Sequence, residues 1–111
     1  MIVTQMRIKN EQRWIERCIT SVIPFSKKVV VFDDHSEDKT EEICRSFKQI
    51  VWVPSPFTGL DEIRDKNYLL EKTLKEKPDW IFSIDGDEEI ESGAKERFER
   101  VLPTLETVDP T

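Results

Sequence analysis

Two pairs of carboxylates are the residues of this sequence whose type and spacing best suit chemistry. Asp85 and Asp87 are separated only by Gly86, and they follow the apolar run 80–84 (WIFSI). Asp33 and Asp34 follow a second run, 28–32 (KVVVF). Carboxylate oxygens are the ligands that Mg²⁺ and Mn²⁺ prefer, and they also accept hydrogen bonds from base N–H groups and ribose hydroxyls. The first pair therefore suits a divalent cation, and the second pair suits a nucleoside.

A solvated acidic turn is the alternative explanation for both pairs. Acidic residues are favoured in the first turn of a helix because they face the positive end of its dipole. An isolated D-x-D is therefore weak support for a metal site. The location of both pairs directly after buried strands favours a site over a solvated turn.

The elements that position these carboxylates alternate between strand and helix. We predict strands at 1–8, 28–32, 50–53 and 80–84. The helices are predicted at 11–22, from 36 or 38 to 47, between 61 and 77, and from 92 or 93 onward. This alternation predicts an α/β fold with a Rossmann-like parallel sheet and helices on both faces. Ligands of such sheets bind at the carboxyl ends of the strands, which is where both pairs lie.

The spacing of apolar residues predicts which side chains the helices bury. Asn10 is the expected N-cap of helix 11–22, and we expect the core to contain the three tryptophans, Trp14, Trp52 and Trp80. The helix after Asp61 is expected to bury one stripe, made of Ile63, Asn67, Leu70 and Leu74. The last helix is expected to bury Phe98, Val101, Leu102 and Leu105.

Composition excludes several classes of function. The chain has 111 residues, enough for one domain, and 17 basic against 23 acidic residues give a net charge of −6. An acidic protein is a poor binder of nucleic acid or of anionic membranes. No apolar run approaches the ~20 residues of a membrane span, and no signal peptide is recognisable. Because two cysteines, Cys18 and Cys44, make no disulfide framework, we expect a reduced, cytoplasmic protein.

Three segments in the same order resemble glycosyltransferase family 2. Residues 29–40 (VVVFDDHSEDKT) are similar to the V-V-D-D-x-S-x-D-x-T stretch of that family. Residues 6–22 are similar to the opening strand and helix of one of its branches, and residues 79–89 (DWIFSIDGDEE) resemble its D-x-D strand and loop. The resemblance covers essentially the whole chain.

The resemblance implies a GT-A fold that binds a nucleotide-diphospho-sugar donor, with Mn²⁺ or Mg²⁺ as cofactor. By motif match, Asp33 or Asp34 contacts the base or ribose, Asp85 faces the ribose or the metal, and Asp87 is the metal ligand. Arg64, with Lys66 as the alternative, matches a basic residue that approaches the donor. Asn67 lies where the family often has an asparagine, although the R-N-x-G pattern is not intact.

The resemblance also implies that 1–111 is a single nucleotide-sugar-binding domain. Members of the family are longer, and their acceptor-binding half and general base follow the D-x-D loop, so we expect the base beyond the end of this chain. The expected acceptor is a saccharide, lipid or protein. We expect the isolated chain to bind donor without transferring sugar, and its uncovered apolar surface makes a homodimer possible.

Two other classes of protein fit part of the pattern. A phospho-receiver domain also places acidic residues and a phosphorylatable aspartate after strands, but its acidic pair follows the first strand, whereas a strand and a helix precede Asp33 here. A noncatalytic nucleotide-binding domain is the second alternative. Binding of a nucleoside diphosphate favours the transferase lineage over the receiver, and binding without turnover favours the noncatalytic domain.

Overall fold

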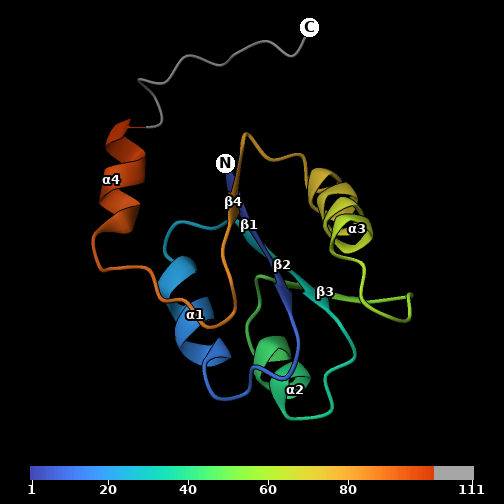
Figure 1. Ribbon diagram of the computed structural model, residues 1–111. Helices are drawn as coiled ribbons and strands as arrows, with labels where there is room; N and C mark the ends of the chain where they lie inside the picture. The colour runs from blue at the N-terminus through green and yellow to red at the C-terminus, as the bar shows by residue number, and fades with distance from the viewer. Residues whose placement is uncertain (102–111) are drawn as a thin grey trace, which may run out of the picture.

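A four-stranded parallel sheet organises the chain in the computed structural model, which describes residues 1–101 (Figure 1). The strands are β1 (Ile2–Ile8), β2 (Lys28–Asp33), β3 (Ile50–Pro54) and β4 (Trp80–Ser83). The helices are α1 (Ile15–Val22), α2 (Thr40–Arg45), α3 (Glu62–Leu74) and α4 (Ala94–Val101). The predicted α/β alternation is therefore confirmed.

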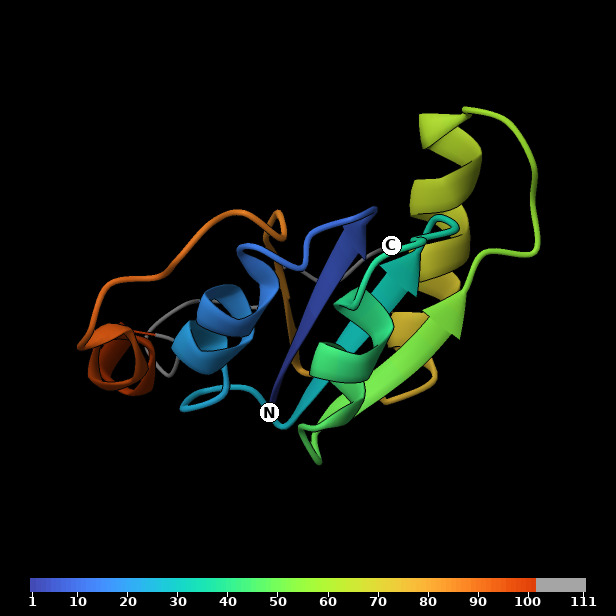
Figure 2. The same ribbon diagram turned by 90° about the horizontal axis from the view of Figure 1, so that it is seen from below.

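The strand order is β3-β2-β1-β4, so the direction of the chain across the sheet reverses at β1. Helices α1 and α2 cover one face of the sheet and α3 covers the other, while α4 lies beyond α1 (Figure 2). The register places Ile8 beside Asp33 and Asp33 beside Pro54. The loops that follow these three strands therefore leave the sheet at one edge, where a parallel sheet binds its ligands.

Alternation along the strands divides the core between the two faces of the sheet. On the side of α1 and α2, Met6 and Ile8 pack with Val29, Val31 and the apolar stripe of α1. On the side of α3, the buried cluster consists of Val3, Val30, Phe32, Val53 and Leu69. Because β2 is buried on both faces, its continuous β-branched run predicts a central strand correctly.

The start of α1 differs from its prediction. The helix begins at Ile15 rather than at residue 11, and Asn10 is not its N-cap but has a left-handed φ of 51°. Trp14 lies just outside the helix, is 41% exposed, and packs against the guanidinium of Arg13. The prediction that Trp14 is a core residue is therefore wrong, and Trp52 and Trp80 are only half-buried.

The buried face of α3 also differs from its prediction. Ile63, Leu70 and Leu74 are 75%, 40% and 55% exposed, whereas the helix buries Asp65, Leu69 and Thr73. Asp61 caps the helix through a hydrogen bond from the Arg64 N–H. The expected apolar stripe thus faces away from the sheet, because a buried carboxylate takes the place that an apolar residue was expected to fill.

Helix α4 extends the core beside β4. Phe98 forms edge-to-face contacts with Phe25 and Phe82, which confirms its predicted inward position. The predicted core positions Leu102 and Leu105 lie outside the described residues. Within residues 1–101, no helix combines the length and apolarity that crossing a bilayer requires.

The orientation of α3 predicts that truncating two adjacent leucines lowers the free energy of unfolding by very different amounts. Leu69→Ala removes a side chain that is 4% exposed and leaves a cavity against Phe32, so we expect a loss of about 3 kcal/mol in the free energy of unfolding. Leu70→Ala, at 40% exposure, is the matched control and should change it by no more than about 0.5 kcal/mol. Urea denaturation at low protein concentration measures both, and the reverse order would contradict this helix orientation.

Candidate functional site

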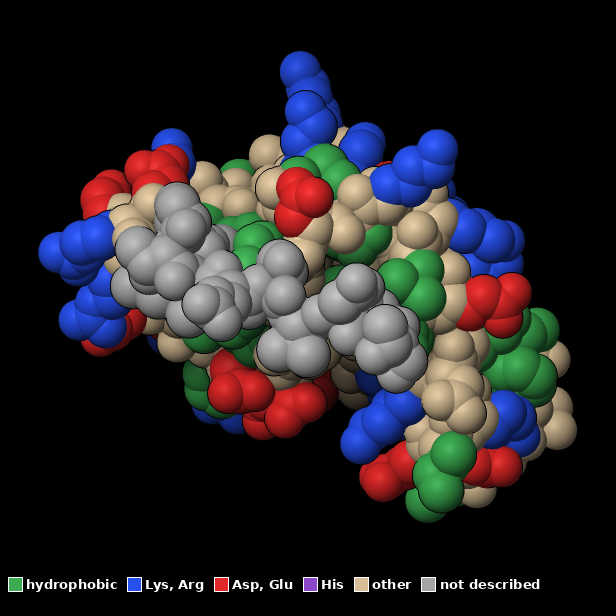
Figure 3. Space-filling view, turned by 90° about the horizontal axis from the view of Figure 1, so that it is seen from above, with side chains coloured by type: hydrophobic (Ala, Val, Ile, Leu, Met, Phe, Trp, Pro, Cys, Tyr) green, Lys and Arg blue, Asp and Glu red, His purple; other side chains and the backbone are tan. Residues whose placement is uncertain are grey.

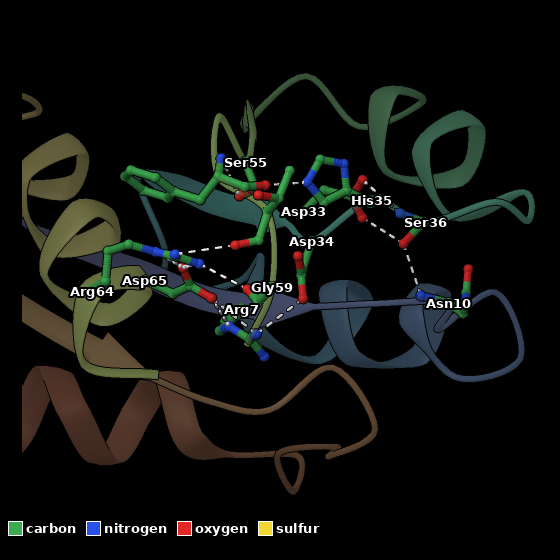
Figure 4. Close-up of polar contacts among 12 residues, drawn as sticks. Arg7, Asn10, Asp33, Asp34, His35, Ser36, Ser55, Gly59, Arg64 and Asp65 are labelled. Atoms are coloured by element: carbon green, nitrogen blue, oxygen red, sulfur yellow. Dashed lines mark hydrogen bonds and ion pairs between the residues drawn. The ribbon is translucent and has the colours of Figure 1, made fainter. Parts of the chain in front are cut away.

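Hydrogen bonds between side chains and backbone join the loops after β1 and β2. The Asn10 N–H donates to Ser36 Oγ at 2.8 Å (Figure 4), and Asn10 Oδ1 accepts from the Glu37 N–H at 2.8 Å. Asn10 therefore uses its left-handed backbone and its amide to reach the neighbouring loop instead of capping α1. Each loop satisfies polar backbone groups of the other, which fixes their separation.

The same exchange is repeated two residues further along both loops. The Gln12 N–H donates to Asp38 Oδ2 at 3.1 Å, and Gln12 Oε1 accepts from the Lys39 N–H at 2.9 Å. Asp38 Oδ1 also accepts from the Thr40 N–H at 2.9 Å. Desolvation alone raises the pKa of Asp38, but these hydrogen bonds, led by that from the Thr40 hydroxyl, outweigh it and lower the pKa.

Asp33 is the last residue of β2 and is buried, with 7% of its surface exposed. Its Oδ1 accepts from Ser36 Oγ at 2.5 Å and its Oδ2 accepts from the Ser36 N–H at 3.1 Å. Its carbonyl accepts from the Ser55 N–H at 2.8 Å, in the loop after β3. Both carboxylate oxygens of Asp33 thus hold the protein's own loop, which supports Asp34 rather than Asp33 as the residue that contacts a ligand.

Asp34 is held by an arginine from the adjacent strand. Its Oδ2 accepts from Arg7 Nη2 at 3.1 Å, and its side chain is 15% exposed. Arg7 Nε donates in turn to Asp65 Oδ2 at 3.0 Å. Arg7 therefore lies between two carboxylates, one from the loop after β2 and one from α3 (Figure 4).

Arg64 continues this chain of charges at the start of α3. Its guanidinium donates to Asp65 Oδ1, with distances of 3.2 Å from Nε and 3.1 Å from Nη2. The same group donates to the carbonyls of Thr58 and Gly59 and stacks on the Phe57 ring with 4.4 Å to the ring centroid. Arg64 thereby fixes the loop between β3 and α3.

Two acidic and two basic side chains form a charge-balanced network, called the Arg–Asp network below, which consists of Asp34, Arg7, Asp65 and Arg64. The Asp65 carboxylate is fully buried, which is tolerable only because both of its oxygens accept from arginines. Sequence reasoning missed Arg7 and Asp65. The available signal was an arginine at a core-facing position of the first strand, which requires a buried acidic partner.

His35 connects the loop after β2 to the loop after β3. Its backbone has a left-handed φ of 59°, and its Nε2 lies 2.6 Å from the Phe57 carbonyl oxygen. The Phe57 ring also packs edge-to-face on Tyr68 of α3. These contacts place an aromatic side chain next to Arg64 at the carboxyl edge of the sheet.

The D-x-D loop leaves β4 on the other side of β1. Asp85 and Asp87 are both exposed, and the turn between them is closed by a hydrogen bond from the Asp85 N–H to Glu88 Oε1 at 2.9 Å. Gly86 is buried against the loop after β1: a Cβ at this position would lie 2.8 Å from Ile8 Cγ2. Only glycine lets the loop approach this closely, which leaves the two carboxylates directed away from the core.

Glu11 brings further negative charge to this loop. Burial raises the pKa of Glu11, and the nearby carboxylates Asp87, Asp38 and Asp85 raise it further. In the described residues, no three His, Cys, Asp or Glu side chains are grouped closely enough to hold a metal ion by themselves. Asp85 and Asp87 nevertheless suit Mg²⁺ or Mn²⁺, because such ions take one or two carboxylates and complete their shell with water and substrate phosphates.

A family model described as glycosyl transferase family 2 matches residues 6–108. The chain belongs to this family. An uncharacterized glycosyltransferase of Rickettsia bellii is 36% identical over 97 residues, which are 85% of this chain and 30% of that protein. Another, of Rickettsia typhi, is 31% identical over 104 residues, which are 91% of this chain and 32% of that protein. The chain thus spans about a third of the length of these curated relatives.

Solved structures of S. aureus TarS share the fold of this family 2 chain. TarS 1–349 superposes with a TM-score of 0.75 at 19% identity, covering 92% of this chain and 31% of that one. TarS 1–349 in complex with UDP superposes with a TM-score of 0.78 at 17% identity, covering 93% and 32%. The GT-A fold expected from the sequence is confirmed, and the phospho-receiver alternative is wrong.

The structure places the predicted site residues at one edge of the sheet but in two groups. Asp34 and Arg64 belong to the Arg–Asp network, and Asp33 supports the loop that bears Asp34. Asp85 and Asp87 lie on the D-x-D loop, which packs on the other side of the β1 terminus.

The Arg–Asp network predicts that Asp65 is essential for stability. Asp65→Asn removes the charge that neutralises Arg7 and Arg64, and we expect a loss of about 3 kcal/mol in the free energy of unfolding. Glu62→Gln, an exposed carboxylate in the same first turn of α3, is the control for the helix dipole and should change it by about 0.5 kcal/mol or less. Equal losses for the two variants in urea denaturation would contradict this role.

Proposed function

We propose that this domain binds the nucleotide-diphospho-sugar donor of a glycosyltransferase, for transfer of the sugar to a saccharide, lipid or protein acceptor. The observation on which this rests most is the pair of acidic groups that flank the end of β1, one tied to Arg7 and one exposed on the D-x-D loop. Family membership and the fold shared with a TarS structure that contains UDP support the same assignment.

In this proposal the Asp34 carboxylate contacts the nucleoside. Its described hydrogen bond uses Oδ2, and the carboxylate keeps a further oxygen to accept from a base N–H or a ribose hydroxyl. Arg7 holds the carboxylate in one orientation before the ligand arrives. Asp33 contributes indirectly, because its hydrogen bond to Ser36 holds the loop that bears Asp34. Arg64 also contributes indirectly, because it stacks on Phe57 and so holds the loop between β3 and α3.

In the same proposal the D-x-D loop holds the diphosphate through a metal ion. Asp87, supported by Asp85, would bind Mn²⁺ or Mg²⁺, and the metal would neutralise the diphosphate that leaves when the sugar is transferred. Without a cation, the negative charge of Glu11, Asp85 and Asp87 would repel a nucleoside diphosphate. The acidic loop therefore makes donor binding depend on the metal.

Removal of Asp87 tests the metal half of the proposal. With Mn²⁺ present, Asp87→Ala should reduce the affinity for UDP at least tenfold, because the phosphates lose their bridging ion. Glu89→Ala, an exposed carboxylate on the same loop, should leave it unchanged. Titration calorimetry with Mn²⁺ and with EDTA measures both, and an unchanged Mn²⁺-dependent affinity in Asp87→Ala would exclude Asp87 as the ligand.

Asp34 tests the nucleoside half separately. Asp34→Asn keeps an oxygen for Arg7 but removes the negative charge, and we expect roughly tenfold weaker binding of UMP even in EDTA. Glu37→Gln, an exposed residue of the same loop, is the control. If the affinity falls only when Mn²⁺ is present, Asp34 belongs to the metal site; if UMP, GMP, CMP and AMP all fail to bind the unmodified chain, the donor proposal itself fails.

A further inference from the structure

The outer face of α3 carries a regular row of exposed apolar side chains. Ile63, Leu70 and Leu74 are 75%, 40% and 55% exposed. With the exposed Asn67 they form a row in which successive residues are four, three and four positions apart. These four residues are called the α3 stripe below. The opposite face of the same helix buries Asp65, Leu69 and Thr73 against the sheet. Spacings of four and three are those of the positions through which two helices pair in a coiled coil.

No described element covers this face of α3, which forms one side of the molecule (Figure 1). Apolar side chains lie among acidic and basic ones on the side of the molecule where α3 lies (Figure 3). Leu60, just before the helix, is also apolar and 79% exposed. A contiguous apolar surface bordered by charges is typical of a protein–protein contact.

Two exposed charges flank the α3 stripe in an arrangement that matches a second copy. Lys66 and Glu71 lie on opposite sides of the stripe and five residues apart. In two parallel helices in register, such positions face each other across the contact, so that Lys66 of each copy meets Glu71 of the other. In an antiparallel pair, each flank of the stripe meets the same flank of the second copy, so Lys66 does not meet Glu71.

Asn67 also favours the parallel arrangement. In a parallel, in-register pair, the two Asn67 side chains meet and can hydrogen-bond to each other, which is how a single asparagine fixes register and the dimeric state in coiled coils. In an antiparallel pair centred on the stripe, Asn67 faces Leu70 and its amide has no partner. Burying an unpaired amide is unfavourable.

We propose that the α3 stripe is a homodimer contact in which α3 of two copies pair in parallel and in register about a two-fold axis along the helix. Ile63, Leu70 and Leu74 of one copy pack against the same residues of the other, with two Lys66–Glu71 pairs at the border. The contact spans only two heptads, which places it among the small interfaces of reversible complexes. Dimer formation should therefore depend on protein concentration.

Cysteine cross-linking tests the geometry of the pair. Asn67→Cys should form an intermolecular disulfide under mild oxidation because the two positions meet on the axis. Lys75→Cys, at the exposed C-cap of the same helix but off the stripe, is the matched control and should link at least tenfold more slowly. The native Cys18 and Cys44 are fully buried and do not compete. Equal linking rates for the two variants would overturn the parallel pairing.

Charge reversal and sedimentation velocity test the pairing in solution. Lys66→Glu and Glu71→Lys each create two like-charge contacts and should weaken the dimer by roughly tenfold, while the double variant should restore it. Leu70→Asp should leave only monomer, with circular dichroism confirming that the chain is folded. A wild-type chain that stays monomeric up to millimolar concentration, a dimer unaffected by Leu70→Asp, or a double variant as weak as the single ones would each overturn the proposal.

Discussion

The position of Arg7 on the first strand is the constraint on which much of the carboxyl edge depends. The side chain lies on the face of β1 that packs against α3, where an unpaired guanidinium would be costly. Asp65 and Asp34 neutralise it from two different elements, and Arg64 neutralises the second oxygen of Asp65. The first turn of α3, the end of β1 and the loop after β2 are thereby held together by ionic hydrogen bonds, because an apolar contact cannot satisfy the charge of Arg7.

Two kinds of loop meet at this edge, and they differ in the contacts that hold them. The loops after β1 and β2 exchange backbone hydrogen bonds through Asn10, Gln12, Ser36 and Asp38, which fixes the acids that they bear. The D-x-D loop instead packs through Gly86 and exposes both aspartates. In the proposed function, the interlocked loops would contact the nucleoside, and the exposed acidic loop would hold the metal and the diphosphate.

The sequence predicts the alternation of strands and helices well, because that signal comes from long apolar runs and from α1's periodic stripe. The sequence-based prediction fails for α3, where the apolar spacing identifies a row of residues correctly but places that row on the buried face instead of the exposed one. The rule that the apolar face is the buried face assumes that charges stay in water. Asp65 breaks this rule because Arg7, 58 positions earlier, pairs with it, and a pairing at that separation leaves no local signal. Trp14 fails for a local reason, since Asn10 bonds to the next loop and α1 begins only at Ile15.

The inverted polarity of α3 connects the site with the surface of the molecule. Once Asp65 is fixed on Arg7, the rotation of the helix about its axis is determined, and Leu69 and Thr73 follow Asp65 onto the sheet at intervals of four residues. The same rotation turns Ile63, Leu70 and Leu74 outward. The buried carboxylate on the inner face of α3 and the exposed apolar residues on its outer face thus both follow from the pairing of Asp65 with Arg7, so a change at Asp65 would alter both the carboxyl edge and the surface that α3 presents.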